Sequence, residues 1–305
     1  MPIIFEGATI SGGISIVPPV PPAEKKAIFG YGNTGSLTAI TNLVSNTGVV
    51  ATDTAGVGTV RLYLAAASYG TDKAIFGYGY DDAATRYSMT NLVSNTGVVA
   101  NDTTGVGTAR NGLAAAGYGT DKAIFGYGYA TDNVSMTNLV SNIGTVANDT
   151  TGVGTARRLV AASTYGTDKA IFGYGYGNDN TAITNLVSNT GVVATDTTGV
   201  GTARNGLAAA GYGTDKAIFG YGNGPLSMTN LVSATGVVAV DTTGVGTARA
   251  SLAAAGYGTD KAIFGYGTTG TNTSITNLVS NTGVVATDTT GVGTARYGLA
   301  AASYG

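Results

Sequence analysis

The side chains that could do chemistry are few in this 305-residue chain, which contains no Cys and no His. Thiolate and imidazole metal ligands are therefore excluded, as are the usual pairs of nucleophile and base. The acidic residues Asp81, Asp82 and Asp132 stand outside the repeated pattern described below. Two carboxylates in one cleft would suit a glycan-processing enzyme, which is one alternative for this chain. The main expectation is no catalytic residue, no metal site and no cofactor.

The charge pattern narrows the choice of partners. Charged residues make up 10% of the chain, the net charge is −2, and no run of basic residues occurs. Nucleic-acid binding driven by counterion release is not expected from such a composition. No segment approaches about 18 consecutive apolar residues, the length of a membrane-spanning helix. We expect neither a nucleic-acid partner nor insertion into a membrane.

A repeated word organises the chain from residue 26 onward. Lys-Ala-Ile-Phe-Gly-Tyr-Gly begins at Lys26, Lys73, Lys122, Lys169, Lys216 and Lys261. A second word, Thr-Asn-Leu-Val-Ser, follows it in every copy, and the length between the two changes only in steps of two. Such steps suit a hairpin that lengthens by one residue on each strand, because side chains then keep their faces.

Each repeat predicts four short strands. In one copy they are Leu113–Gly117, Lys122–Gly128, Ser135–Ser141 and Thr145–Thr150, here called a, b, c and d. Four strands in about 45 residues are typical of a propeller blade. The chain enters the repeat at strand b and ends with a strand a, Leu299–Gly305. We therefore expect an all-β, six-bladed β-propeller of four-stranded blades, closed by pairing of the C-terminal strand with the first blade.

The N-terminal residues differ in composition from the repeats. Met1–Val17 alternate weakly, like a short β arm, and Pro18-Pro19-Val20-Pro21-Pro22 predicts an extended spacer. We expect residues 1–25 to form an arm and spacer, and residues 26–305 to form the propeller. The arm, residues 1–22, is expected to attach the propeller to other proteins of a larger assembly.

The blade resembles a kelch repeat through Arg110, the apolar strand Leu113–Ala116, the second strand Ala123–Phe125, and the glycines Gly126 and Gly128. It departs from that pattern because Tyr separates the two glycines and no Trp occurs. Copper oxidases on kelch-type propellers use a Cys–Tyr cofactor and His ligands, which this chain lacks. The array, with its Gly-rich opening Phe5–Ile16, also resembles bacteriophage virion proteins of tails or fibres. That resemblance implies a virion or extracellular surface location and receptor binding in host attachment.

Otherwise similar copies differ at two places. One is the b–c tip: Asn33–Ala39, Tyr80–Tyr87, Tyr129–Val134, Tyr176–Ala182, Asn223–Leu226 and Thr268–Thr273. The other is the pair of residues after each repeated Arg. In an up-and-down blade both lie on one face, where a partner would touch them. Tyr provides contact area at modest entropic cost. Expected contacts are Tyr80, Asp81, Asp82, Arg86, Tyr87, Tyr129, Asp132 and Tyr297. Loop tips also drift when nothing constrains them, which is the alternative.

The repeated arginines are Arg61, Arg110, Arg157, Arg204, Arg249 and Arg296. Each follows a run that begins with Asp and recurs in every copy, so we expect a structural pairing with Asp53, Asp102, Asp149, Asp196, Asp241 or Asp288. The alternative is a ring of arginines that binds an anion at the mouth of a central channel. Together these features predict a non-enzymatic virion or cell-surface module that binds a host glycan or protein through its variable loops. A purely architectural propeller without a ligand is a further alternative.

Overall fold

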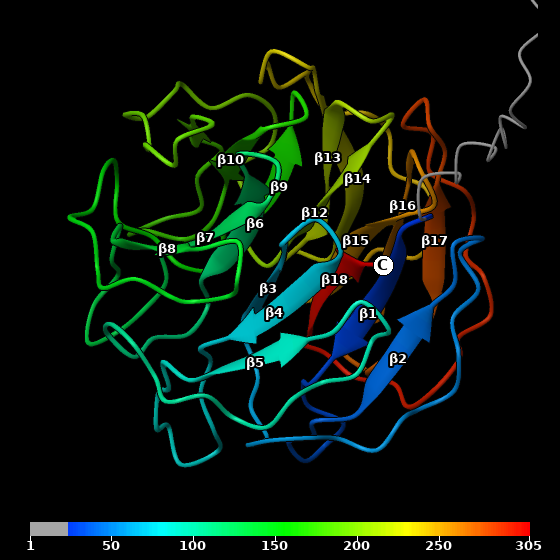
Figure 1. The fold of residues 1–305 in the computed structure, drawn as a ribbon. Coiled ribbons are helices and arrows are strands. Elements are labelled where there is room, and N and C mark those ends of the chain that lie inside the picture. Colours follow the sequence, from blue (N-terminus) through cyan, green and yellow to red (C-terminus); the bar gives the residue numbers. More distant parts are fainter. Residues whose placement is uncertain (1–23) are drawn as a thin grey trace, which may run out of the picture.

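The computed structural model describes residues 24–305, in which every regular element is a β-strand. None of these residues forms a helix that is long and apolar enough to cross a membrane. The predicted β arm, proline spacer and attachment through residues 1–22 lie outside the described residues and stay predictions. Figure 1 shows the strands gathered in groups around a common centre.

The strands form six antiparallel sheets of three strands each. The middle strands carry the repeated word: β1 (Lys26–Gly30), β4 (Lys73–Gly77), β7 (Lys122–Gly126), β10 (Lys169–Gly173), β13 (Lys216–Gly222) and β16 (Lys261–Gly265). The inner strands are β3 (Ala65–Tyr69), β6 (Ala114–Tyr118), β9 (Ala161–Tyr165), β12 (Ala208–Tyr212), β15 (Ala253–Tyr257) and β18 (Ala300–Tyr304). The outer strands are β2 (Thr41–Val44), β5 (Thr90–Val93), β8 (Thr137–Val140), β11 (Thr184–Val187), β14 (Leu226–Val232) and β17 (Thr276–Val279).

The middle strands are buried on both faces, which explains their unbroken apolar run. Successive side chains of a strand point to opposite sides of the sheet. In β7, Phe125 packs with Tyr78 of the preceding sheet, whereas Ile124 packs with Phe172 of the following one. The inner strands are rich in Ala, since six of them converge on one centre and leave little room for side chains. The hydrophobic core therefore consists of six similar layers between neighbouring sheets.

The prediction of a regular fourth strand in each blade is wrong, because each sheet has three strands. The segment around Thr145–Thr150 touches β8 only through two isolated bridges, Val140↔Val146 and Thr137↔Thr150. These bridges leave three residues on the outer segment opposite two on β8, which is the extra residue of a β-bulge. A bulge interrupts the ladder and bends the strand. The same pair of bridges recurs in every sheet.

The two ends of the described chain meet in one sheet. β18 pairs with β1 in antiparallel register, from Lys26↔Tyr304 to Gly30↔Ala300. The pairing expected between the C-terminal strand and the first repeat is therefore present, and Figure 1 shows red β18 beside blue β1. Each inner strand also neighbours the inner strand of the next sheet, in the order β3, β6, β9, β12, β15, β18 and again β3.

The repeats differ in length between their two repeated words, and this difference is not always taken up by longer strands. In four sheets an isolated bridge closes a three-residue tip, as in Tyr129↔Asn133. The longest tip keeps this bridge, as Tyr80↔Arg86, and places its two extra residues inside the loop. The expected lengthening of both strands is therefore wrong for this repeat. The shortest tip does extend its strands, because β13 and β14 continue pairing to Gly222↔Leu226.

Candidate functional site

A buried arginine lies at each junction between sheets, and Arg157 illustrates its contacts. Its Nε donates a hydrogen bond to the backbone oxygen of Tyr174 at 2.8 Å, and its Nη2 donates to Asn185 Oδ1 at 2.7 Å. Its Nη1 donates to the backbone oxygen of Thr155 at 3.0 Å. The Tyr127 ring of the preceding sheet lies 4.3 Å from Arg157 Cζ. One guanidinium thus binds its own sheet by hydrogen bonds and the preceding sheet by stacking.

We call this arrangement the arginine clamp, and it occurs six times. The Cζ atom lies 4.2 to 4.6 Å from the ring in Arg61–Tyr31, Arg110–Tyr78, Arg157–Tyr127, Arg204–Tyr174, Arg249–Tyr221 and Arg296–Tyr266. Nη2 donates to an Asn Oδ1 each time, in Arg61–Asn91, Arg110–Asn138, Arg157–Asn185, Arg204–Asn230, Arg249–Asn277 and Arg296–Asn42. Arg61 differs in one respect, since its buried Nε lacks a hydrogen-bond partner.

An aspartate lies near each clamp, and in three of the six it forms an ion pair with the arginine at 3.6 to 3.8 Å: Arg61–Asp102, Arg110–Asp149 and Arg204–Asp241. Asp149 accepts hydrogen bonds from Thr108 and from Asn138 Nδ2, and lies 3.7 Å from Arg110 Nη1. Burial acts to raise the pKa of Asp149, but the hydrogen bonds from Thr108 and Asn138 and the nearby Arg110 outweigh it, so the pKa is lowered. Equivalent threonine bonds reach Asp53, Asp102, Asp196, Asp241 and Asp288.

The interruption of the glycine pair by Tyr has a structural explanation. Tyr127 is fully buried with a φ of 63°, and its hydroxyl donates to the backbone oxygen of Val153 at 3.2 Å. Burial raises the pKa of Tyr127 to about 12, opposed by the charge of Arg157. Left-handed backbone is strained for Tyr, so the surrounding contacts must hold it there. The ring supplies the surface on which the clamp arginine stacks.

The clamp arginines have no accessible surface, since all six are 0% exposed. An anion in solvent could not reach their guanidinium groups. The alternative of an anion-binding ring made by these six residues therefore has no geometric support. We infer that they hold neighbouring sheets together.

Six backbone hydrogen bonds form a closed ring on one side of the molecule. Tyr63 N donates to Gly298 O at 2.7 Å, Gly298 N to Ser251 O at 2.9 Å, and the series returns to Tyr63 O through Gly112 N at 2.8 Å. The complete ring is Tyr63, Gly298, Ser251, Gly206, Leu159 and Gly112. Every member has a positive φ, between 49° and 64°. With the Leu and Val residues that follow them, they line a cavity of about 70 Å³.

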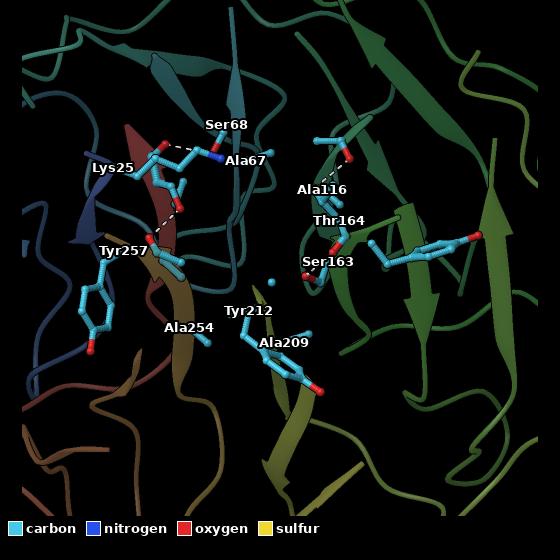
Figure 2. Close-up of a pocket in the computed structure, with 18 of the residues that line it drawn as sticks. Lys25, Ala67, Ser68, Ala116, Ser163, Thr164, Ala209, Tyr212, Ala254 and Tyr257 are labelled. Carbon is cyan, nitrogen blue, oxygen red and sulfur yellow. Dashed lines mark hydrogen bonds between the residues drawn. The ribbon is translucent and has the colours of Figure 1, made fainter. Parts of the chain in front are cut away.

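A larger cavity of about 220 Å³ lies among the inner strands of all six sheets. Figure 2 shows small side chains around it, among them Ala209 and Ala254, together with the hydroxyl groups of Ser68 and Thr164. Both hydroxyls donate to backbone oxygens, of Ser303 and of Gly117. The threonines of the a–b turns also border it. It therefore belongs to the side with constant turns, not to the side with variable tips.

The two variable sets of the sequence are brought together in pairs. The first residue after a clamp arginine pairs with the first residue of the tip in the same sheet, as in Asn111↔Tyr129. The other pairs are Tyr297↔Asn33, Leu62↔Tyr80, Arg158↔Tyr176 and Ala250↔Thr268, and Asn223 N donates to Asn205 O in the remaining sheet. We call the surface formed by these pairs and the tips the tip face.

Three tyrosines form a continuous aromatic group on the tip face. Tyr63 stacks on Tyr80 with ring centroids 6.1 Å apart, and meets Tyr297 edge-on at 6.2 Å. Burial raises the pKa of Tyr63 and of Tyr80. Tyr63 Oη also lies 3.3 Å from Ser251 Oγ across the backbone ring. The predicted contacts Tyr80 and Tyr297 thus lie side by side through Tyr63, which the prediction did not include.

The other predicted contacts have different surroundings. Tyr87 donates a hydrogen bond to Asp81 Oδ2 at 2.8 Å, which lowers the pKa of Asp81 and raises that of Tyr87. This pair shapes its own tip. Asp82 and Asp132 are exposed. Arg86 lies over the ring of Tyr129, with Cζ 4.8 Å from the centroid.

Arg158, like Tyr63, was not among the predicted contacts. Its Cζ lies 4.7 Å from the Tyr129 centroid and 5.2 Å from that of Tyr176. It is the one charged residue among the positions that directly follow the clamp arginines, and this signal could have identified it.

No family model matches the sequence, and no curated protein matches it. Within residues 24–305, no group of three or more acidic side chains is placed to hold a metal ion. The function must therefore be argued from the geometry alone.

Proposed function

We propose that this chain is a non-enzymatic recognition module on a closed six-bladed, kelch-like propeller, and that it binds a host glycan or protein through the tip face. The observation that carries the proposal is the aromatic and cationic strip on that face. It runs through Tyr297, Tyr63 and Tyr80, and continues with Arg86, Tyr129, Arg158 and Tyr176. Tyr and Arg are among the residues enriched in recognition surfaces.

Closure of the propeller is supported by contacts at the junction of the last and first repeats. β18 pairs with β1, and Arg296 forms the same clamp there as the other arginines form elsewhere. A ring without free sheet edges also avoids edge-to-edge aggregation. Each blade would then have three regular strands and one bulged outer segment.

The strip covers only part of the tip face. Its residues come from four consecutive sheets, whereas the tips Asn223–Leu226 and Thr268–Thr273 of the other two contain neither Tyr nor Arg. A binding surface of this kind is localised, and random drift of six equivalent tips would not favour adjacent ones. The virion or cell-surface setting rests on the resemblance to phage tail and fibre proteins, and attachment through residues 1–22 belongs to the same proposal.

A glycan array probed with the full chain tests this function. The matched variant carries the Asn223–Leu226 tip in place of the other five tips, with circular dichroism and thermal unfolding as controls for folding. We expect the chain to bind a subset of glycans and the variant to lose that binding. Absence of binding by both proteins, to the array and to host-surface extracts, overturns the proposal. Equal binding by the folded variant does so too.

A further inference from the structure

The chain has eight arginines, of which six form the buried clamps. The remaining two, Arg86 and Arg158, come from different sheets and are 72 positions apart in the numbering. Both lie over the same ring, that of Tyr129 in the sheet between them, at 4.8 and 4.7 Å. Every arginine outside the clamps thus converges on one side chain of the tip face.

A paired Tyr and Arg lie on each side of Tyr129. Arg86 pairs through its backbone with Tyr80, and Arg158 pairs with Tyr176. Two Tyr–Arg pairs from flanking sheets therefore enclose Tyr129. Cation–π contacts with the central ring orient both guanidinium groups before any ligand arrives.

Neither guanidinium is neutralised by a carboxylate. Among the described residues, all arginine–aspartate ion pairs belong to clamp arginines. Arg86 Nε donates to Asn111 Oδ1 at 3.3 Å, which leaves most of its five donors free. The acidic residues of the three tips involved form no ion pair with either arginine; they are Asp81, Asp82, Asp132 and Asp179. Each guanidinium therefore keeps its charge and free donors for an anionic group of a ligand.

We propose that Arg86 and Arg158, both held by Tyr129, bind the anionic groups of an acidic saccharide, carboxylates or sulfate esters. The planar guanidinium fork matches both groups with paired hydrogen bonds. The half-buried rings of Tyr80 and Tyr176 on either side offer apolar surface for the adjoining sugar rings. This inference rests on the proposed function and names the ligand class for the same face.

Binding of the full chain to four probes tests the inference by isothermal titration calorimetry. The probes are an oligogalacturonate for the carboxylate, a sulfated dextran oligosaccharide for the sulfate, neutral dextran of equal length, and single-stranded DNA as an unrelated polyanion. We expect an acidic saccharide to bind, and neutral dextran and DNA to bind at least tenfold more weakly. The two acidic probes distinguish the carboxylate from the sulfate.

Substitutions locate the site. Arg86→Gln and Arg158→Gln should each weaken acidic-saccharide binding about tenfold to hundredfold, as expected for loss of charged hydrogen bonds. Arg158→Lys keeps the charge without the fork and should weaken it less. Lys122→Gln removes the same charge from the start of β7, next to an a–b turn, and should change nothing. Thermal unfolding of each variant checks that the fold is kept.

The outcomes separate this inference from the proposed function. No binding of either acidic saccharide overturns the inference, whereas glycan-array binding to neutral sugars would leave the proposed function intact. Equal binding of DNA, or an equal loss in Lys122→Gln, indicates unspecific attraction of polyanions and also overturns it.

Discussion

Arg296 Nη2 donates a hydrogen bond to Asn42 Oδ1 at 2.7 Å, although 254 residues separate the two. The same bond joins Arg110 and Asn138 at 2.6 Å across 28 residues. The junction of the last and first repeats therefore uses the contacts found between consecutive repeats. No special joining segment is needed, because the repeated sequence already supplies complementary surfaces at both ends.

The adjacent residues Arg157 and Arg158 should respond differently to the same substitution. Arg157→Met removes three hydrogen bonds, two of which are buried. We expect it to lower the free energy of unfolding by about 3–5 kcal/mol. Arg158→Met removes only contacts with half-buried rings, and should change it by less than about 1 kcal/mol. Urea unfolding followed by circular dichroism measures both, and equal effects would contradict the clamp.

Arg296→Met tests whether the ring is closed. In a closed ring the substitution should destabilise the protein by about 3–5 kcal/mol, as at an internal junction. If the first and last sheets were apart in solution, Arg296 would lie at a free end and the substitution would have little effect. Removal of residues 299–305 gives a second test, because it deletes all of β18 and exposes the edge of β1. We expect the shortened chain to associate on size-exclusion chromatography; a monomer of unchanged stability contradicts closure.

The glycine that follows Phe in the repeated word leaves space for the next sheet. A Cβ on Gly126 would lie 2.7 Å from Phe172 Cζ, whereas one on Gly211 would have no neighbour nearer than 3.5 Å. We expect Gly126→Ala to destabilise the protein by about 1–3 kcal/mol through overpacking. Gly211→Ala should be neutral or stabilise it by up to about 1 kcal/mol, because it restricts the unfolded chain. Urea unfolding of both variants measures these changes. A Gly126→Ala variant of unchanged stability would contradict the tight packing of neighbouring sheets at this glycine.

Asp149 should contribute to stability in a way that depends on pH. Its pKa is lowered in the folded protein, so the contribution is present above the unfolded value of about 3.9 and is lost as pH falls through the folded pKa. Asp149→Asn removes the carboxylate at every pH. The variant should therefore be less stable than the parent at pH 7, and the difference should shrink below about pH 4. Urea unfolding from pH 7 to pH 3 measures it; a difference that grows on acidification would contradict the assignment.

Much of the fold could be predicted from the sequence because the pattern is local and repeated. The word Lys-Ala-Ile-Phe-Gly begins each middle strand at the expected residue, and Lys122–Gly126 is one example. The inner strand was expected at Leu113–Gly117 and lies at Ala114–Tyr118, a shift of one residue. The tip boundaries also followed from comparison of the repeats, and the pairing Asn111↔Tyr129 brings the two variable sets together.

The fourth strand could not be predicted, because a bulge depends on register and not on composition. Thr145–Thr150 has the residues of a strand, but one extra residue between its two bridges to β8 breaks the ladder. The sequence likewise suggested that each arginine pairs with an aspartate, and the structure adds the Asn oxygen and the Tyr ring of the preceding sheet.

The sequence by itself determined the number of repeats, the strand order and the positions free to vary, since each follows from residues that are close along the chain. The tertiary structure decided which distant side chains meet. Arg86, Tyr129 and Arg158 belong to three sheets, and only the packing of those sheets places both guanidinium groups over one ring. Arg296 similarly reaches Tyr31 and Asn42 only because β18 returns to β1.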